Sequence, residues 1–288
     1  MRTNELFKNK TVLSFEVFPP KRDAPIDTIY KTLAELGNLS PDFISVTCGA
    51  GGDGGNTTVQ IASDIKNMYG RESVAHLPCI NLTKADVLHT LAQLKENGIE
   101  NILALRGDYN PSVAPKTDFK YAADIVAFIK EHGDFNIIGA CYPEGHSEAA
   151  SLAVDVKNLK TKVDAGVSQL VSQLFFDNQY FYSFLERAEI SDIDVPIQAG
   201  IMPVTNKKQI ERILELCGAA LPEKFKKIMD KYENNPSALR DAGIAYAIDQ
   251  IVDLITHDVD GIHLYTMNNP GLARRITDSV SSLFKVNK

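Results

Sequence analysis

The chain has 288 residues, of which 44% are apolar, and its 37 acidic and 30 basic residues give a net charge of −7. This length and composition fit a globular protein with one large domain or two small ones. The acidic balance disfavours general binding to nucleic acids or to anionic membranes. A local group of basic residues can still bind a phosphate.

The sequence also predicts a cellular location. The N-terminal residues MRTNELFKNK mix charges around no apolar core, so they do not resemble a secretory signal. No apolar run approaches the roughly 18 residues that cross a bilayer. The four cysteines form no C-x-x-C pair. We therefore expect a cytoplasmic protein with reduced thiols and no membrane segment.

Short runs rich in β-forming residues recur along the whole chain, with helical patterns between them. The expected strands cover residues 12–18, 42–48, 74–80, 101–107, 136–142, 168–176, 195–202 and 261–267. This alternation predicts parallel strands, because parallel neighbours need a long crossover connection.

Some of the intervening helices carry clear boundary signals. Thr83 and Asp86 have the spacing of a capping box, and the helix that follows should end at Gly98. Ser147 is the expected cap of a helix that runs to about Asp164. These signals predict the start or the end of single helices independently of the strands.

The fold class follows from the number of repeats. Eight strand–helix units in this length favour a single (β/α)8 barrel, with residues 1–288 as one catalytic domain. The span 206–256 holds more helix than one crossover needs, so we expect an extra helix before the last main helix, with Pro222 and Pro236 as breaks. A doubly wound sheet is the alternative.

In such barrels the active site lies at the carboxyl ends of the strands. Ser14, Glu16 and Phe18 face one side of the first strand, whereas the opposite side, at positions 13, 15 and 17, is apolar. Glu16 should therefore point into the barrel mouth. Other strands place polar residues near the same end: Thr47, His76, Asp108, Tyr142, Gln173 and Tyr265. This convergence predicts a functional site at one rim.

Two of these rim positions suggest specific chemistry. Glu16 is a candidate general acid, because an apolar mouth disfavours a charged carboxylate. The alternative for Glu16 is a structural pairing with a buried Lys or Arg. In the run Arg106-Gly107-Asp108, the glycine would let a flat ligand approach the backbone. The alternative is a turn with an internal ion pair.

A third candidate feature lies on a predicted helix. Asp155, Asn158 and Lys162 share one helix face beside an apolar stripe, where an acid could bind ribose hydroxyls and a lysine a phosphate. A solvated polar face is the alternative. We expect no metal site, because His76 and Cys79 are three residues apart on a strand and so face opposite sides.

These residues also resemble a known family, that of the bacterial methylenetetrahydrofolate reductases. The resemblance runs in order over almost the whole chain. It rests on SFEVFPPK (14–21), SVTCGAGG (45–52), AHLPC (75–79), ALRGD (104–108), CYPEGH (141–146), DVKNLKTKVDAG (155–166), QLFFD (173–177), GIMPVTN (200–206) and HLYTMN (263–268). It implies a β/α barrel that binds FAD, takes electrons from NADH or NADPH, and reduces 5,10-methylenetetrahydrofolate in a ping-pong reaction.

The resemblance also implies roles for single residues. Glu16 matches the general acid that protonates the bridge nitrogen of the folate, and Asp108 matches an aspartate that tunes flavin and pterin. The positions that match FAD contacts are Thr47, His76, Arg106, Gly107, Asp108, Ala140, Tyr142, His146, Asp155, Asn158 and Lys162. The positions that match the folate and nicotinamide side are Glu16, Gln173, Gln209 and Tyr265. Members of the family often form homo-oligomers, which we expect here too.

Two positions depart from the family pattern. Asn269 stands where an arginine is usual, and Thr161 replaces a common basic residue beside Lys162. These departures concern contacts to the folate tail and to the FAD phosphates. Two rival functions remain open: a zinc- or cobalamin-linked folate methyltransferase, and a non-catalytic subunit that binds flavin or folate.

Overall fold

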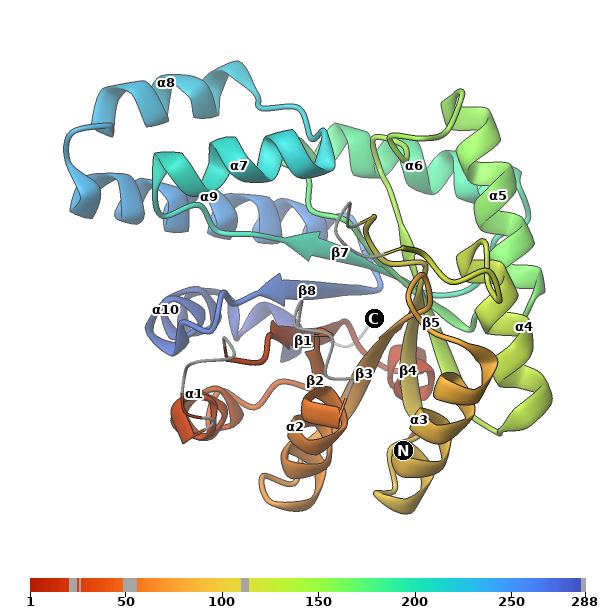
Figure 1. The fold of residues 1–288 in the computed structure, drawn as a ribbon. Coiled ribbons are helices and arrows are strands. Elements are labelled where there is room, and N and C mark those ends of the chain that lie inside the picture. The colour runs from red at the N-terminus through yellow and green to blue at the C-terminus, as the bar shows by residue number, and fades with distance from the viewer. Residues whose placement is uncertain (21–24, 26, 49–55, 110–113, 286–288) are drawn as a thin grey trace.

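A computed structural model of the protein describes residues 1–20, 25, 27–48, 56–109 and 114–285, except for the side chains at positions 209, 212 and 216. In this described part, eight parallel strands form a closed barrel in sequence order, with β1 paired to both β2 and β8 (Figure 1). The strands are β1 (Val12–Val17), β2 (Phe43–Val46), β3 (Glu72–Pro78), β4 (Asn101–Leu105), β5 (Asn136–Cys141), β6 (Gln169–Ser172), β7 (Ile197–Ile201) and β8 (Gly261–Tyr265). The predicted (β/α)8 barrel is confirmed.

Helices surround this barrel in the order that crossover connections require. They are α1 (Asp27–Gly37), α2 (Asn56–Asn67), α3 (Lys84–Glu96), α4 (Ala122–His132), α5 (Leu152–Asp164), α6 (Asn178–Ile190), α7 (Lys207–Cys217), α8 (Glu223–Tyr232), α9 (Pro236–Thr256) and α10 (Pro270–Val280). Short 3-10 helices, η1 (Thr3–Lys8) and η2 (Leu283–Lys285), lie near the two ends. Among the residues that the structure describes, no helix combines the length and apolarity needed to cross a membrane.

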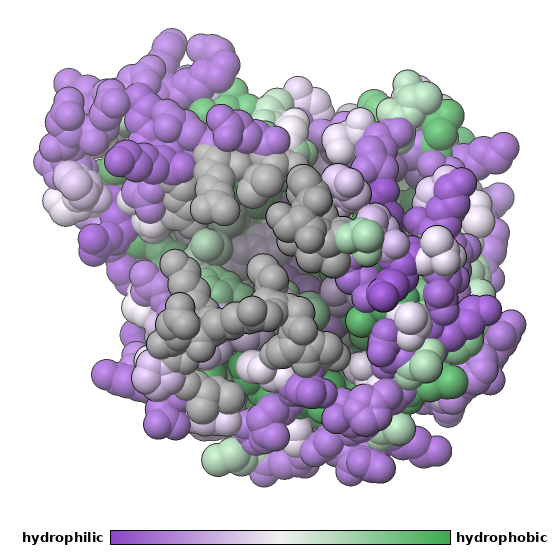
Figure 2. Space-filling view, in the orientation of Figure 1, coloured by the Kyte–Doolittle hydropathy of each residue, from purple (hydrophilic) through white to green (hydrophobic). Residues whose placement is uncertain are grey.

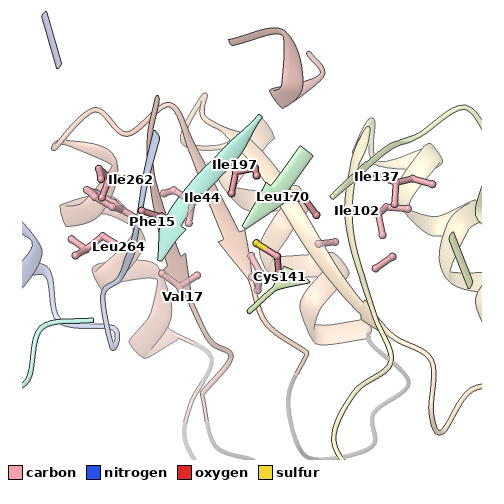
Figure 3. Close-up of a cluster of buried hydrophobic side chains, with 14 of the residues drawn as sticks. Phe15, Val17, Ile44, Ile102, Ile137, Cys141, Leu170, Ile197, Ile262 and Leu264 are labelled. Atoms are coloured by element: carbon pink, nitrogen blue, oxygen red, sulfur yellow. The ribbon is translucent and has the colours of Figure 1, made fainter. Parts of the chain in front are cut away.

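The main core lies between the barrel wall and the helices. Outward-facing residues from different strands, such as Phe15, Ile44 and Ile262, are fully or almost fully buried in this layer (Figure 3). The outer side of β1 is therefore apolar, as predicted, and Phe15 and Val17 are both inaccessible to solvent. Burial of this side turns the alternate residues, including Glu16, toward the barrel interior.

The barrel interior is filled by side chains in layers, as is usual for this fold. One of these layers is apolar, and Phe7 from η1 packs against it from the N-terminal end of the barrel. Its strand members are Val12, Phe43, Val74, Leu103, Ile138 and Val171. Beneath it, Thr3 donates a hydrogen bond to Gln169 (2.8 Å), and Asn136 donates to Thr3 and Asn101 (both 3.0 Å). The N-terminal end is thus closed, which leaves the carboxyl ends of the strands for a ligand.

Helices α7, α8 and α9 form an extension on one side of the barrel, where α8 stacks over α7 and α9 (Figure 1). A second hydrophobic cluster, which includes Phe176, Phe225 and Leu239, holds it together. The predicted additional helix is confirmed. Pro222 is the N-cap of α8 and Pro236 is the first residue of α9, so both prolines lie at helix starts.

The boundary signals in the sequence have mixed outcomes. The capping box of Thr83 and Asp86 is present, and Gly98 lies just beyond the end of α3 with a φ of +70°. The prediction that Ser147 caps the next helix is wrong. Ser151 is the cap, and its hydroxyl accepts a hydrogen bond from the backbone N–H of Val154 (3.3 Å). The residues between them form a loop that belongs to the candidate site.

Candidate active site at the carboxyl ends of the strands

Glu16 lies near the end of β1, beside Ser45 of β2 and Tyr265 of β8 in the sheet register. Its side chain is 19% exposed, and Oε2 lies 3.5 Å from the Nε2 atoms of both His76 and His263. The carboxylate therefore stands between two imidazole rings at the inner edge of the barrel. In the space-filling view, a hollow opens at the centre of the face turned to the viewer (Figure 2).

The ring of His263 is completely buried, and hydrogen bonds to Ser14 and from there to Gln198 hold it in place. Its Nδ1 lies 2.6 Å from Oγ of Ser14, and that hydroxyl accepts a hydrogen bond from Nε2 of Gln198 at 2.9 Å. Since the Ser14 oxygen already accepts from Gln198, its own proton is available for Nδ1 of His263. A neutral ring in this arrangement carries its proton on Nε2, which lies 3.5 Å from both Oγ of Ser45 and Oε2 of Glu16.

The second imidazole, His76, is different. It is buried, and its Nε2 is without a hydrogen-bond partner among the described residues. Burial lowers the pKa of His76 to about 4, although the negative charge of Glu16 acts to raise it. The ring is therefore neutral near pH 7. A buried polar atom with no partner in the protein is suited to pair with a ligand.

A second group of predicted residues lies around the end of β4 and the loop after β5. Arg106 forms an ion pair with Glu148, in which Nη2 donates to Oε1 at 2.9 Å. The backbone N–H of Glu148 donates to Nδ1 of His146 (3.1 Å), whose ring lies edge-on to Tyr142 with centroids 4.7 Å apart. Burial raises the pKa of Tyr142 to about 12, and the negative charge of Asp108 adds to the effect.

Gly107, between Arg106 and Asp108, has a left-handed φ of +89°. A Cβ atom at this position would lie 2.9 Å from Cβ of Pro78 and 3.2 Å from a methyl group of Ile80. Glycine is therefore required both by the backbone conformation and by close packing against the segment that ends β3. Asp108 follows it at the rim with an exposed side chain.

Helix α5 brings a third group to the same side. Asp155 is buried, and burial raises its pKa, whereas a hydrogen bond from the backbone of His146 acts in the opposite direction. The ammonium group of Lys162 donates to the carbonyl oxygen of Ala140 on β5, and burial lowers its pKa. Asn158, on the same helix, is exposed. A lysine nitrogen held at a strand end is a hydrogen-bond donor that can bind a phosphate.

Besides Glu16, the predicted folate-side residues lie in separate parts of the chain: Tyr265 ends β8, Gln173 follows β6 and Gln209 belongs to α7. The hydroxyl of Tyr265 donates to the carbonyl oxygen of Ser172 at 2.8 Å. The side-chain oxygen of Gln173 accepts from the backbone N–H of Leu174 (3.0 Å). Thr47, a predicted FAD contact, follows β2, and its carbonyl oxygen accepts from the hydroxyl of Thr58 (3.0 Å). Gln209 belongs to α7, but its side chain lies outside the described residues.

Comparison with known proteins decides the family. The family model described as methylenetetrahydrofolate reductase matches residues 2–281. The chain belongs to the methylenetetrahydrofolate reductase family. Among its relatives, 5,10-methylenetetrahydrofolate reductases from Pectobacterium carotovorum and Escherichia coli K12 are both 37% identical. Each alignment covers 92% of this chain and 88% of the relative.

The chain is accordingly an oxidoreductase that converts methylenetetrahydrofolate to methyltetrahydrofolate. Methylenetetrahydrofolate reductase (NADH) 1 from Arabidopsis thaliana is 34% identical over 91% of this chain, which spans only 47% of that protein. A solved structure of a Clostridium thermocellum protein, described as binding two copies of 5-methyl-5,6,7,8-tetrahydrofolic acid, superposes with a TM-score of 0.69. The superposition covers 96% of each chain at 12% sequence identity, so it shows a similar fold.

Two features of the site do not follow from the sequence reasoning. In the sequence, His263 appears only within the motif HLYTMN (263–268), although in the structure it contacts Glu16 directly. Glu148, the partner of Arg106, does not enter it at all. For His263 a signal exists, because a histidine two residues before a rim tyrosine must point into the barrel. For Glu148 no periodic pattern exists, because it lies in a loop.

Proposed function

We propose that this member of the family reduces 5,10-methylenetetrahydrofolate to 5-methyltetrahydrofolate with bound FAD, which NADH or NADPH reduces in a separate half-reaction. The observation that carries the proposal is the carboxylate of Glu16, held between His76 and His263 at the inner edge of the barrel. A proton donor in this position can act on a flat ligand that enters from the open end. The name of the Arabidopsis relative supports NADH as one reductant.

Glu16 would supply the proton that opens the five-membered ring of the folate. Protonation of the bridge nitrogen lets its bond to the methylene carbon break, and the bonding electron pair remains on nitrogen. The carbon is left as an iminium that can accept a hydride. Nε2 of His263 lies 3.5 Å from Oε2 of Glu16, so a proton on this nitrogen can stabilise the carboxylate that remains after proton transfer.

The described residues fit an FAD molecule at this rim. The buried Nε2 of His76 has no hydrogen-bond partner among them, and the side-chain nitrogen of Lys162 is held as a donor at the end of β5. Arg106, Tyr142, His146, Asp155 and Asn158 line the neighbouring strand ends and α5, and they would hold the rest of the cofactor. When bound, FAD would carry electrons from the nicotinamide to the folate carbon.

The experiment that tests this function is an anaerobic absorbance titration. Purified protein, reconstituted with FAD, should show flavin bands that bleach with NADH or NADPH and return when 5,10-methylenetetrahydrofolate is added. Flavin that neither nucleotide can bleach would require another electron donor. A protein that cannot bind FAD at all would contradict the proposal and favour a zinc- or cobalamin-linked folate methyltransferase. FAD binding without folate turnover would favour a non-catalytic subunit.

We also propose that the enzyme works in the cytoplasm. The support is chemical: Cys79, Cys141 and Cys217 are free thiols in the structure.

A further inference from the structure

The turn that follows β8 holds the end of β1, where Glu16 lies. The hydroxyl of Thr266 donates to the carbonyl oxygen of Glu16 at 2.6 Å. Asn268 pairs with the backbone of Phe18 twice: its Nδ2 donates to the carbonyl oxygen at 2.8 Å, and its Oδ1 accepts from the N–H at 3.0 Å. Side chains of one turn therefore grip the backbone at Glu16 and two residues beyond it.

The grip is itself braced. The backbone N–H of Asn268 donates to the hydroxyl of Thr266 at 3.3 Å, so the two gripping residues are linked. Thr266 is completely buried. Met267 and Asn268 both have a φ of +53°, in the left-handed region that residues other than glycine rarely occupy. Such strained residues persist where the surrounding structure fixes them, and they concentrate at functional sites.

Strand pairing alone does not explain these contacts. Glu16 is already in register with Ser45 of β2 and Tyr265 of β8, so the sheet holds its Cα without help from the turn. The side-chain bonds of Thr266 and Asn268 act where the sheet ends. They hold the backbone at Glu16 and Phe18, where the chain leaves β1.

We propose that Thr266 and Asn268 are positioning residues, which fix the Glu16 carboxylate between its two histidines so that it is aligned with the folate nitrogen. The inference rests on the proposed function, since it assumes that Glu16 delivers a proton to folate. A catalytic group must be held within about 0.5 Å of its productive position, and a misplacement of about 1 Å can cost a hundredfold in rate.

Two substitutions test the grip with little change in side-chain volume. Thr266→Val removes the hydroxyl that binds Glu16 and Asn268. Asn268→Asp keeps an acceptor for the N–H of Phe18 but replaces the donor to its carbonyl oxygen with a charged oxygen. Thr266→Ser restores the hydroxyl and should rescue the loss. Asn235→Ala removes an asparagine cap from α9, away from β1, and controls for lost stability.

Each half-reaction is measured by stopped-flow absorbance of the bound flavin. We expect Thr266→Val and Asn268→Asp to slow flavin reoxidation by 5,10-methylenetetrahydrofolate by about tenfold to a hundredfold, with bleaching by NADH within about twofold of wild type. The pH profile of reoxidation should change, because the proton donor has moved. Crystal structures of the folded variants should show the Glu16 carboxylate displaced by more than about 0.5 Å.

Wild-type reoxidation rates in both variants, with Glu16 in place, would overturn the inference and leave the proposed function intact. Equal slowing of both half-reactions, matched by Asn235→Ala at the same loss of stability, would show a purely structural role and overturn it too. If wild-type flavin is not reoxidised by the folate at all, the proposed function itself fails, and the inference fails with it.

Discussion

At the scale of single residues, Glu16 is the proposed proton donor, and one substitution should separate the two proposed half-reactions. Glu16→Gln keeps the size of the side chain but removes the acidic proton. We expect the variant to bind FAD and to be bleached by NADH, while folate reduction falls by about 10²- to 10⁴-fold, the usual contribution of a general acid. Stopped-flow rates of the two half-reactions check this. Glu5→Gln, on the exposed side of η1, is the control.

Normal folate turnover by Glu16→Gln would remove Glu16 from the proton-transfer role. His263, which also contacts Glu16, would then become the candidate for that role. The amide oxygen introduced by the substitution can accept a hydrogen bond from Nε2 of His263 as the carboxylate can. A loss of folate reduction in this variant would therefore be due to the missing proton and not to a displaced side chain.

Asn269, which departs from the family pattern, caps helix α10. The sequence marks it as a departure from the family arginine. The structure adds that its side-chain oxygen accepts from the backbone N–H of Leu272 at 3.0 Å, which caps α10 ahead of Pro270. Asparagine is among the residues preferred at this cap, so Asn269 has a structural function at the start of α10.

At the scale of elements, Gly243 decides how α9 packs against the segment after β7. A Cβ atom there would lie 1.7 Å from the carbonyl oxygen of Val204, which is backbone and cannot turn aside. We therefore expect Gly243→Ala to reduce the free energy of unfolding by about 1–3 kcal/mol or more, despite the better helix propensity of alanine.

Urea denaturation of Gly243→Ala beside Gly271→Ala measures this effect. Gly271 is also helical, but a Cβ atom there meets nothing closer than the Asn269 side-chain oxygen at 3.5 Å. That substitution should leave stability unchanged or raise it by up to about 1 kcal/mol. Equal effects of the two substitutions would mean that α9 can move away from Val204 without cost.

The elements themselves are largely predictable from the sequence, because alternation of strand and helix is a local and repeated pattern. The predicted strands lie within a few residues of the observed bounds, and the capping box at Thr83 is correct. The cap at Ser147 is wrong because Ser147 and Ser151 are equally good caps by residue type. The choice depends on the loop between them, where Glu148 binds Arg106 and the backbone of His146 binds Asp155.

At the scale of the whole molecule, hydrogen bonds link the closed end of the barrel to the candidate active site. Gln169, which binds Thr3, donates to Gln198 at 3.0 Å, and Gln198 donates to Ser14 beneath His263. These residues come from η1 and from four strands distant in sequence. Each looks like an ordinary polar residue in its own segment. Only the closed barrel brings them together, so the sequence alone could not reveal the support under Glu16.

The last prediction concerns the pH dependence of folding and rests on His76. Its pKa is about 4 in the folded protein and about 6.5 in the unfolded chain, because burial disfavours the charged ring despite the nearby Glu16. Between these values the unfolded chain binds more protons, so stability falls as the pH decreases from about 6.5 toward 4. The full difference corresponds to roughly 3 kcal/mol.

Urea unfolding of FAD-free protein between pH 4 and pH 7 tests this prediction. His76→Gln cannot take up the proton, so its stability relative to wild type should improve steadily as the pH falls through that range. Parallel curves for the two proteins would mean that His76 titrates alike in both states, and that its ring is not confined as the structure shows. The uncharged ring of His76 thus lowers the stability of the folded protein in mild acid, and its Nε2 has no hydrogen-bond partner among the described residues. This cost is expected for a residue that is retained to bind a ligand.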